Sequence, residues 1–147
     1  MSTEIEPRLA TEEEFWALKL AIDEAHFLRR ESVGAALGNS LFGVVAKLGD
    51  SVVGAGRIVG DGAMYCYIQD VMVDPEYQNN GIGTEIMDNL MAWIDTYMPE
   101  NIYIGLFTGV DLDSFYARYS FKSSEEFLYG MCTKKRSGVI DLTREGR

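Results

Sequence analysis

The sequence predicts a mixed α/β domain in which one mostly antiparallel sheet is covered by helices on both faces. Glycine turns separate three segments of β-branched and aromatic residues in the middle of the chain, and helical patterns precede and follow them. A length of 147 residues and a hydrophobic fraction of 47% suit one domain with a normal core. We therefore expect a single domain over residues 1–147, with a polar tail from about residue 136 that is loosely held.

The N-terminal segment, residues 5–23, predicts a short strand and then a helix. Thr11 and Glu14 fit the capping box, in which each side chain accepts a bond from the other residue's backbone N–H at the start of a helix. Phe15 and Leu18 then fall on one helical face, which we expect to be buried.

The following residues predict a second, shorter helix and an antiparallel meander. The helix is expected over residues 24–38 and ends near Gly38. Strands are expected at residues 41–48, 51–60 and 63–73, because β-branched runs alternate there with glycine-containing turns. Pro75 ends the third strand, since proline has no backbone N–H to donate to a sheet.

The C-terminal part predicts a helix, a strand, a helix and a strand in turn. Apolar residues at helical spacing run from about Gly81 to Pro99, where the helix ends. Residues 101–107 form an apolar run, which we expect to be a buried strand. Residues 111–120 predict a short helix, and residues 127–135 predict a last strand.

Negative charge is concentrated in the middle of the chain. The net charge is −10, and no Lys or Arg occurs between Ile58 and Ala117. Such a surface attracts cations and repels nucleic acid, which binds proteins through Lys and Arg. We therefore expect no nucleic-acid partner, although an acidic surface that only keeps the protein soluble explains the same composition.

Residues that mark export, disulfides or metal sites are scarce. No apolar run approaches the roughly 18 residues that a membrane span needs, and the acidic N-terminus lacks a signal-peptide pattern, so we expect no membrane partner. We expect a cytoplasmic protein whose Cys66 and Cys132 are reduced. A single histidine, His26, is too little for a zinc site or a Ser-His-Asp triad, so no metal is expected. We expect Asp111 or Asp113 to cap the short helix near them, and not to act as glycosidase carboxylates.

The stretch "YQNNGIGTEIM", residues 77–87, places two glycines where a helix is expected to start. Helix N-termini present unpaired N–H groups and the positive end of the helix dipole, so they bind phosphate without a side-chain cation. The stretch lacks the P-loop lysine, and it has Ile86 where the dinucleotide fingerprint requires glycine. On these residues alone, a purely structural helix start is the competing interpretation.

Two longer patterns make this stretch more specific. Gln78-x-x-Gly81-x-Gly83 resembles the Q/R-x-x-G-x-G/A acyl-CoA-binding motif of the GNAT acetyltransferase superfamily. Residues 68–87 resemble that family's central strand, loop and helix, and "FYARYSF" at residues 115–121 is similar to its F-Y-x-x-x-G-F segment. The resemblance implies a GNAT fold with a splayed central strand, and acetyl-CoA as the acyl donor.

The resemblance also implies which residues hold acetyl-CoA. Backbone groups of the splayed strand would pair with the pantetheine arm, and one of its amides would polarise the thioester carbonyl. The strand residues concerned are Val71, Met72 and Val73. The residues around the pyrophosphate, acting mostly through main-chain N–H groups, would be Gln78, Asn79, Asn80, Gly81, Ile82, Gly83 and Thr84.

The chemistry implied by the resemblance is direct transfer of an acetyl group to an amine. Tyr116 of the F-Y-x-x-x-G-F segment would protonate the departing CoA thiolate. The ammonium group of the substrate must first lose a proton, and Asp70 is the preferred base, with a water relay as the alternative. Gln69 and Tyr67 would shape the acceptor pocket. A structural carboxylate at position 70 and a packing tyrosine at position 67 are the competing interpretations.

The chain departs from the family pattern at several positions. Asn79 and Asn80 stand where the family commonly has Gly and a basic residue or Gln, so cofactor binding should depend little on salt. Ser120 replaces a glycine of the C-terminal segment, which leaves the backbone path there open. Arg118 and Lys122 are the first basic residues after the glycine loop, and they are either CoA phosphate ligands or solvated bases at a helix end.

These observations favour an N-acetyltransferase that acts on the primary amine of a small molecule. The acidic middle of the chain suits a cationic amine better than a phosphosugar. A protein or peptide N-acetyltransferase and a non-catalytic acyl-CoA-binding module are the alternatives, and the presence of Tyr116 counts against the latter. Dimers are common among similar proteins, so a homodimer is one expectation for the assembly.

Overall fold

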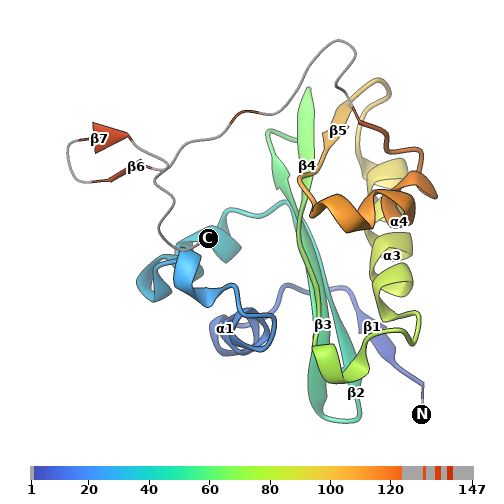
Figure 1. The fold of residues 1–147 in the computed structure, drawn as a ribbon. Helices are drawn as coiled ribbons and strands as arrows, with labels where there is room; N and C mark the ends of the chain where they lie inside the picture. Colours follow the sequence, from blue (N-terminus) through green and yellow to red (C-terminus); the bar gives the residue numbers. More distant parts are fainter. Residues whose placement is uncertain (1, 124–130, 132–134, 137–138, 141–147) are drawn as a thin grey trace. The chain divides into compact units, whose positions relative to one another are not determined.

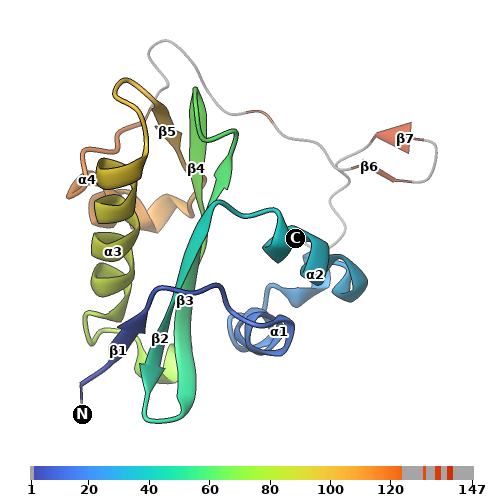
Figure 2. The same cartoon turned by 180° about the vertical axis from the view of Figure 1, so that it is seen from behind.

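The computed structural model describes residues 2–123, 131, 135–136 and 139–140 (Figures 1 and 2). The chain divides into two compact units, residues 1–106 and 107–147, and each is described by itself. The strands and α-helices of the first unit are β1 (Glu4–Glu6), α1 (Glu12–Ala21), α2 (Val33–Gly38), β2 (Phe42–Leu48), β3 (Ser51–Gly60), β4 (Tyr65–Val73), α3 (Ile82–Tyr97) and β5 (Tyr103–Gly105). Its 3-10 turns are η1 (Ala25–Phe27), η2 (Arg30–Ser32) and η3 (Pro75–Tyr77). The second unit contains η4 (Val110–Leu112), α4 (Asp113–Ala117), β6 (Lys135–Arg136) and β7 (Val139–Ile140).

A five-stranded sheet in the order β1-β2-β3-β4-β5 forms the centre of the first unit. The pairs β1–β2, β2–β3 and β3–β4 are antiparallel, and β4–β5 is parallel. Helices α1 and α2 lie on one face of this sheet, and α3 lies on the other (Figures 1 and 2). The predicted fold class and the predicted meander of three strands are confirmed.

Each face of the sheet has its own apolar core. On the face covered by α1 and α2, the buried cluster consists of Ala10, Phe15, Leu18, Val33, Leu37, Val45, Ala55 and Met72. On the other face, the buried side of α3 is formed by Ile82, Ile86, Met87, Leu90 and Ile94. The apolar spacing that predicted these two helices therefore identifies the faces that they bury.

Helix α3 packs closely on β3 because two glycines of that strand leave room for it. Ile86 and Leu90 are fully buried where the helix meets the sheet. A Cβ atom on Gly54 would lie 3.0 Å from Ile86 Cδ1, and one on Gly56 would lie 2.9 Å from Leu90 Cδ1. Both distances are shorter than ordinary van der Waals contact, so these glycines determine how near the helix lies to the strand.

Two predicted elements are shorter than expected. The second helix, α2, begins only at Val33, because the residues before it form the 3-10 turns η1 and η2. The strand expected at residues 101–107 is present but shorter, since β5 covers only Tyr103–Gly105. The expectation that it is buried is wrong, since the Tyr103 side chain is 62% exposed. Strand β5 lies at the end of the described sheet, so only one of its edges is paired.

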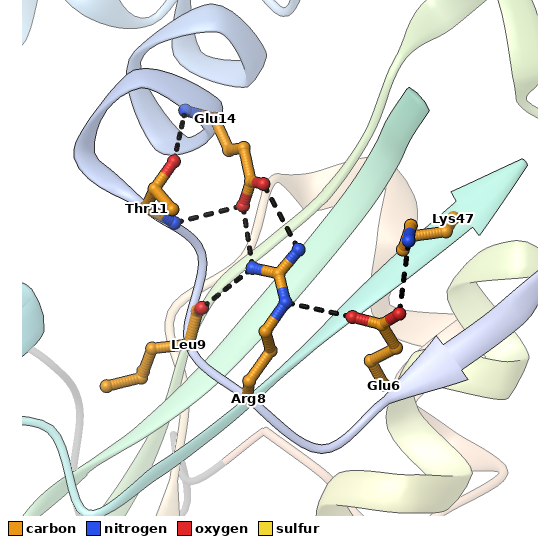
Figure 3. A network of polar contacts seen from close by, with 6 residues as sticks. All are labelled: Glu6, Arg8, Leu9, Thr11, Glu14 and Lys47. Carbon is orange, nitrogen blue, oxygen red and sulfur yellow. Dashed lines mark hydrogen bonds and ion pairs between the residues drawn. The ribbon is translucent and has the colours of Figure 1, made fainter. Parts of the chain in front are cut away.

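A polar network joins β1, β2 and the start of α1 (Figure 3). The capping box is confirmed, because the Glu14 N–H donates to Thr11 Oγ1 at 3.1 Å and the Thr11 N–H donates to Glu14 Oε2 at 3.0 Å. Arg8 binds the Glu14 carboxylate through both terminal nitrogens and binds Glu6 through Nε at 2.9 Å. Lys47 Nζ lies 3.1 Å from the other oxygen of Glu6. The network ties the helix start to the edge of the sheet.

The second unit is described in part. Helix α4 follows η4 directly, and Leu112 at its N-cap position provides no side-chain bond, so the expectation that Asp111 or Asp113 caps this helix is wrong. Asp113 is already helical at φ −60° and is the first residue of α4, one position too late to cap it. The strand predicted at residues 127–135 lies largely outside the described residues, as do Cys132 and the end of the tail. In the described part of the chain, no helix is long and apolar enough to cross a membrane.

Candidate functional site

Strand β4 separates from β5 partway along its length (Figure 1). The parallel pairing runs from Tyr65 opposite Tyr103 to Tyr67 opposite Gly105 and then stops. Strand β4 continues to Val73, and among the described residues its positions 68–73 pair with β3 only. The splayed central strand that the resemblance implies is therefore present. Val71, Met72 and Val73 lie in the part of β4 that has no β5 partner.

A β-bulge interrupts β4 in this unpaired part. Between two paired positions β3 has the single residue Gly56, whereas β4 has Asp70 and Val71 in the same interval. Asp70 has φ 53°, in the left-handed region that aspartate adopts more readily than most residues. Bulges increase the local twist of a strand and change where its side chains point, and they occur often beside active sites.

The carboxylate of Asp70 is held between two cations. Lys19 Nζ lies 2.9 Å from Oδ1, and Arg57 Nε lies 2.7 Å from Oδ2. The exposed fractions of the side chains are 7% for Lys19, 15% for Arg57 and 11% for Asp70. Arg57 also donates to the carbonyl of Ala36 at 3.1 Å and to Ser40 Oγ at 3.0 Å. This network connects β4 with α1, α2 and β3.

Sequence reasoning identified Asp70 but missed both of its partners. Lys19 lies next to Leu18 and one turn after Phe15, on the face of α1 that is buried. A lysine on an apolar face is a signal, because buried lysines are rare unless paired. Arg57 interrupts a strand that otherwise contains small and apolar residues, which is a similar signal.

The loop after β4 places backbone N–H groups at the start of α3. Asn79 has φ 65° and Gly81, the N-cap residue, has φ 80°, so the chain turns through two left-handed residues. The Glu85 N–H donates to the Gly81 carbonyl at 3.0 Å as the first bond of the helix. The amides of Ile82 and Gly83, in the first turn, therefore have no acceptor within the helix. A Cβ atom on Gly81 would meet nothing within 4 Å, so open space lies in front of this residue.

Side-chain amides fix the backbone of this loop. Gln78 Nε2 donates to the carbonyl of Val73 at 3.1 Å. Asn80 Nδ2 donates to the carbonyls of Tyr77 and Gln78 at 3.0 and 3.1 Å. These bonds hold the loop in a shape that leaves its main-chain N–H groups to face the start of α3. Left-handed residues, open space and a helix start together fit the pyrophosphate of acetyl-CoA.

The expected acceptor residues lie on the α1 and α2 side of β4. Gln69 pairs with Arg57 and Tyr67 pairs with Val59, and directly paired residues share a face of the sheet. The Tyr67 ring lies over Gly105, where a Cβ atom would be 2.8 Å from Tyr67 Cδ1. Tyr67 is thus at the last paired position before β4 and β5 separate. That Gln69 and Tyr67 contact the acceptor stays a prediction.

Tyr116 is buried in the second unit, in helix α4. Its ring packs edge-on against Phe115 at 4.9 Å and Phe121 at 6.4 Å between centroids. Burial raises the pKa of the phenol above its ordinary value, so Tyr116 keeps its proton at neutral pH and can donate it. Ser120 has φ 69°, so it adopts the left-handed conformation expected of the glycine that it replaces. Arg118 Cζ lies 4.8 Å from the centre of the Phe115 ring.

Other reactive groups do not form a second centre in the described residues. Cys66 is fully buried, and burial, together with the charge of Asp61, raises the pKa of its thiol. His26 lies beside Phe27, with ring centroids 4.1 Å apart. No group of three or more His, Cys, Asp or Glu residues in the described part of the chain is arranged to hold a metal ion.

Comparison with known proteins agrees with this geometry. The model of the acetyltransferase (GNAT) family matches residues 6–121. The chain is 32% identical over 80 residues to the chloroplastic GCN5-related N-acetyltransferase 2 of Arabidopsis thaliana, covering 54% of this chain and 30% of that protein. It is 33% identical over 81 residues to the histone acetyltransferase TAP1 of Glycine max, covering 54% of this chain and 34% of that protein. The chain spans about a third of the length of these relatives.

Solved structures give matches over nearly the whole chain. A probable acetyltransferase of Staphylococcus aureus is 28% identical with a TM-score of 0.84, covering 91% of this chain and 100% of that one. A GNAT family protein of Streptococcus pneumoniae is also 28% identical, with a TM-score of 0.76 and coverage of 92% and 100%. On the extent of the family match, this chain belongs to the acetyltransferase (GNAT) family.

Proposed function

We propose that this protein is an acetyl-CoA-dependent N-acetyltransferase that acetylates the primary amine of a small molecule. The observation that carries the proposal is the part of β4 beyond Tyr67, which has no partner strand on its β5 side among the described residues and leads through the glycine loop into the start of α3. Membership of the family supports acetyl transfer. The backbone of Val71, Met72 and Val73 would hold the pantetheine arm, and the residues from Gln78 to Thr84 would hold the pyrophosphate.

The proposed reaction is direct transfer. The neutral amine nitrogen attacks the thioester carbonyl carbon, the C–S bond breaks, and the thiolate takes a proton. Tyr116 is the proposed donor of that proton, because its buried phenol stays protonated at neutral pH. The proton lost by the amine passes to a base or through water to solvent. Asp70 was the expected base, but both of its oxygens are bound to cations, so a water relay has more support.

The acceptor is proposed from charge. No Lys or Arg occurs between Ile58 and Ala117, a segment that contains β4, the glycine loop and α3. A cationic amine is attracted to such a region, and a phosphorylated sugar is repelled. A protein or peptide acceptor is the second candidate, because one relative is named a histone acetyltransferase. A non-catalytic acyl-CoA-binding module is the third, and a buried, protonated Tyr116 counts against it.

A thiol-release assay on the full chain tests these candidates. Acetyl-CoA is offered with polyamines, arylalkylamines, phosphorylated and plain aminosugars, and lysine peptides, and free CoA is measured against an amine-free control. We expect turnover with a cationic small amine. Turnover with peptides alone would establish the second candidate, and CoA binding without release from any amine would establish the third. The absence of a thermal shift with millimolar acetyl-CoA would refute the donor assignment itself.

A further inference from the structure

The buried ion pairs around Asp70 form one network, which we call the β4 network and define as Lys19, Arg57 and Asp70. Its members come from α1, β3 and β4, and the Lys19 side chain is buried while those of Arg57 and Asp70 are largely buried. Lys19 also binds Glu24 at 3.1 Å, but the Glu24 side chain is 51% exposed. Asp70 is thus the carboxylate that Lys19 and Arg57 share.

The β4 network acts at the point where the strand is distorted. Asp70 is the left-handed residue of the bulge, and Val71 next to it belongs to the unpaired edge. Glycine is common at the left-handed position of a bulge because it has no side chain to strain. An aspartate there keeps the conformation and adds a carboxylate that Lys19 and Arg57 hold from two sides. The ion pairs therefore fix the side chain of the residue whose backbone forms the bulge.

The geometry does not suit a base that touches the substrate. Each oxygen of Asp70 already contacts a cation at 2.9 Å or less, so protonation would break at least one ion pair. A small cavity of about 10 Å³ adjoins the carboxylate and is lined also by Phe15, Leu37 and Met72. This volume holds about one water molecule and excludes an amine substrate.

We propose that Lys19, Arg57 and Asp70 are positioning residues, which hold the bulge of β4 and thereby keep Val71 and Val73 in the conformation that binds the acyl donor. The inference rests on the proposed function, because it assigns the unpaired edge to acetyl-CoA. It extends that function because these three side chains, which lie between the sheet and helices α1 and α2, would hold part of the donor site in place. The acyl-CoA-binding motif does not contain them.

A matched control is available in the same chain. Glu6 is also held by one arginine Nε, from Arg8, and one lysine Nζ, from Lys47, at 2.9 and 3.1 Å (Figure 3). Asp70→Asn and Glu6→Gln therefore remove the same kind of interaction at two places. Lys19→Met is the second test variant, because it removes one cation and leaves the Arg57 pair with Asp70.

The experiment measures amide hydrogen exchange at residues 68–73 and CoA affinity by calorimetry. In Asp70→Asn and Lys19→Met we expect faster exchange in this segment and CoA binding weakened by about tenfold or more, since small misplacements of a site are costly. Glu6→Gln should change neither. If Asp70 were instead the base, Lys19→Met should change turnover and leave CoA affinity unchanged. The reason is that a carboxylate that loses a neighbouring cation accepts protons more readily.

Several outcomes would overturn the inference. Asp70→Asn with normal exchange and CoA affinity but lost turnover would make Asp70 the base. Equal effects of Glu6→Gln on exchange and CoA affinity would mean that the network contributes only to the general stability of the fold. If Asp70→Asn does not fold, Lys19→Met decides by the same two measurements. Failure of the wild-type protein to bind CoA would refute the proposed function and the donor part of the inference, whereas exchange would still show whether the network holds the bulge.

Discussion

The side-chain amide of Gln78 donates a hydrogen bond to the carbonyl oxygen of Val73 at 3.1 Å. The bond closes the loop after β4 onto the last residue of that strand. Asn80 fixes the same loop through the carbonyls of Tyr77 and Gln78. The end of the site proposed for phosphate therefore depends on uncharged side chains that bind the loop's own backbone.

Gln78→Leu should weaken CoA binding by up to about tenfold, because a typical hydrogen bond contributes roughly 0.5–1.5 kcal/mol. Titration calorimetry with CoA measures the effect. Asn89→Leu is the control, since the Asn89 amide also donates to a backbone carbonyl, that of Glu85 at 2.8 Å, on the exposed surface of α3. Unchanged affinity in Gln78→Leu, or equal losses in both variants, would contradict the role of Gln78.

Gly81→Ala should lower the free energy of unfolding by about 1–2 kcal/mol and weaken CoA binding strongly, because the residue has φ 80°. Chemical denaturation and calorimetry measure the two effects. Gly38→Ala separates backbone conformation from packing, since a Cβ atom at either position meets nothing within 4 Å but only Gly81 has a positive φ. Retained affinity in Gly81→Ala would place the phosphate site elsewhere.

Tyr116→Phe should reduce kcat by roughly 100-fold or more while CoA affinity is kept, as expected for loss of a general acid. Burial raises the pKa of this phenol above the roughly 10 of a free tyrosine, so it stays protonated below that pH. The ratio of wild-type to variant rates should therefore be constant between about pH 7 and 9.

Tyr119→Phe, in the same segment, is the control and should keep its activity. If the ratio of wild-type to Tyr116→Phe rates fell to one between about pH 7 and 9, the group that donates the proton would ionise in that range. That result, or equal rates in Tyr116→Phe and the wild type, would remove Tyr116 as the acid.

Thr11→Ala should lower the free energy of unfolding by about 1 kcal/mol and the melting temperature by roughly 2–4 °C, because it removes the N-cap of α1. Activity should not change. Thr96→Ala is the comparison, since the Thr96 hydroxyl donates to the Ala92 carbonyl at 2.9 Å within α3 and caps nothing. A loss in Thr96→Ala as large as that in Thr11→Ala would show that capping is not the cause.

Features that depend on neighbours in the sequence could be predicted. Thr11 and Glu14 form the capping box because both groups lie within one turn of helix. Helix α3 begins directly after Gly81, as the glycines and the apolar spacing after them predicted. The fold class also followed, since apolar spacing and glycine turns are local patterns.

Features that depend on distant partners could not be predicted. The partners of Asp70 come from α1 and β3, and although Lys19 and Arg57 each stand out in an apolar segment, the local pattern does not indicate which carboxylate they bind. The exposure of Tyr103 depends on which strands lie beside β5, so an apolar run alone gave the wrong expectation. The capping expected of Asp111 failed because η4 leads into α4 without a break.

The glycines of β3 have a consequence for how mutants of this protein would be interpreted. A Cβ atom on Gly54 would lie 3.3 Å from Ile82 Cγ2 as well as 3.0 Å from Ile86 Cδ1, and Ile82 is the first residue of α3. A methyl group added there would also lie 2.9 Å from the Met72 carbonyl oxygen, so it would displace the backbone of β4 and crowd the start of the helix. A genetic screen for weakened donor use should therefore recover substitutions in β3, beneath the helix, alongside those in the glycine loop.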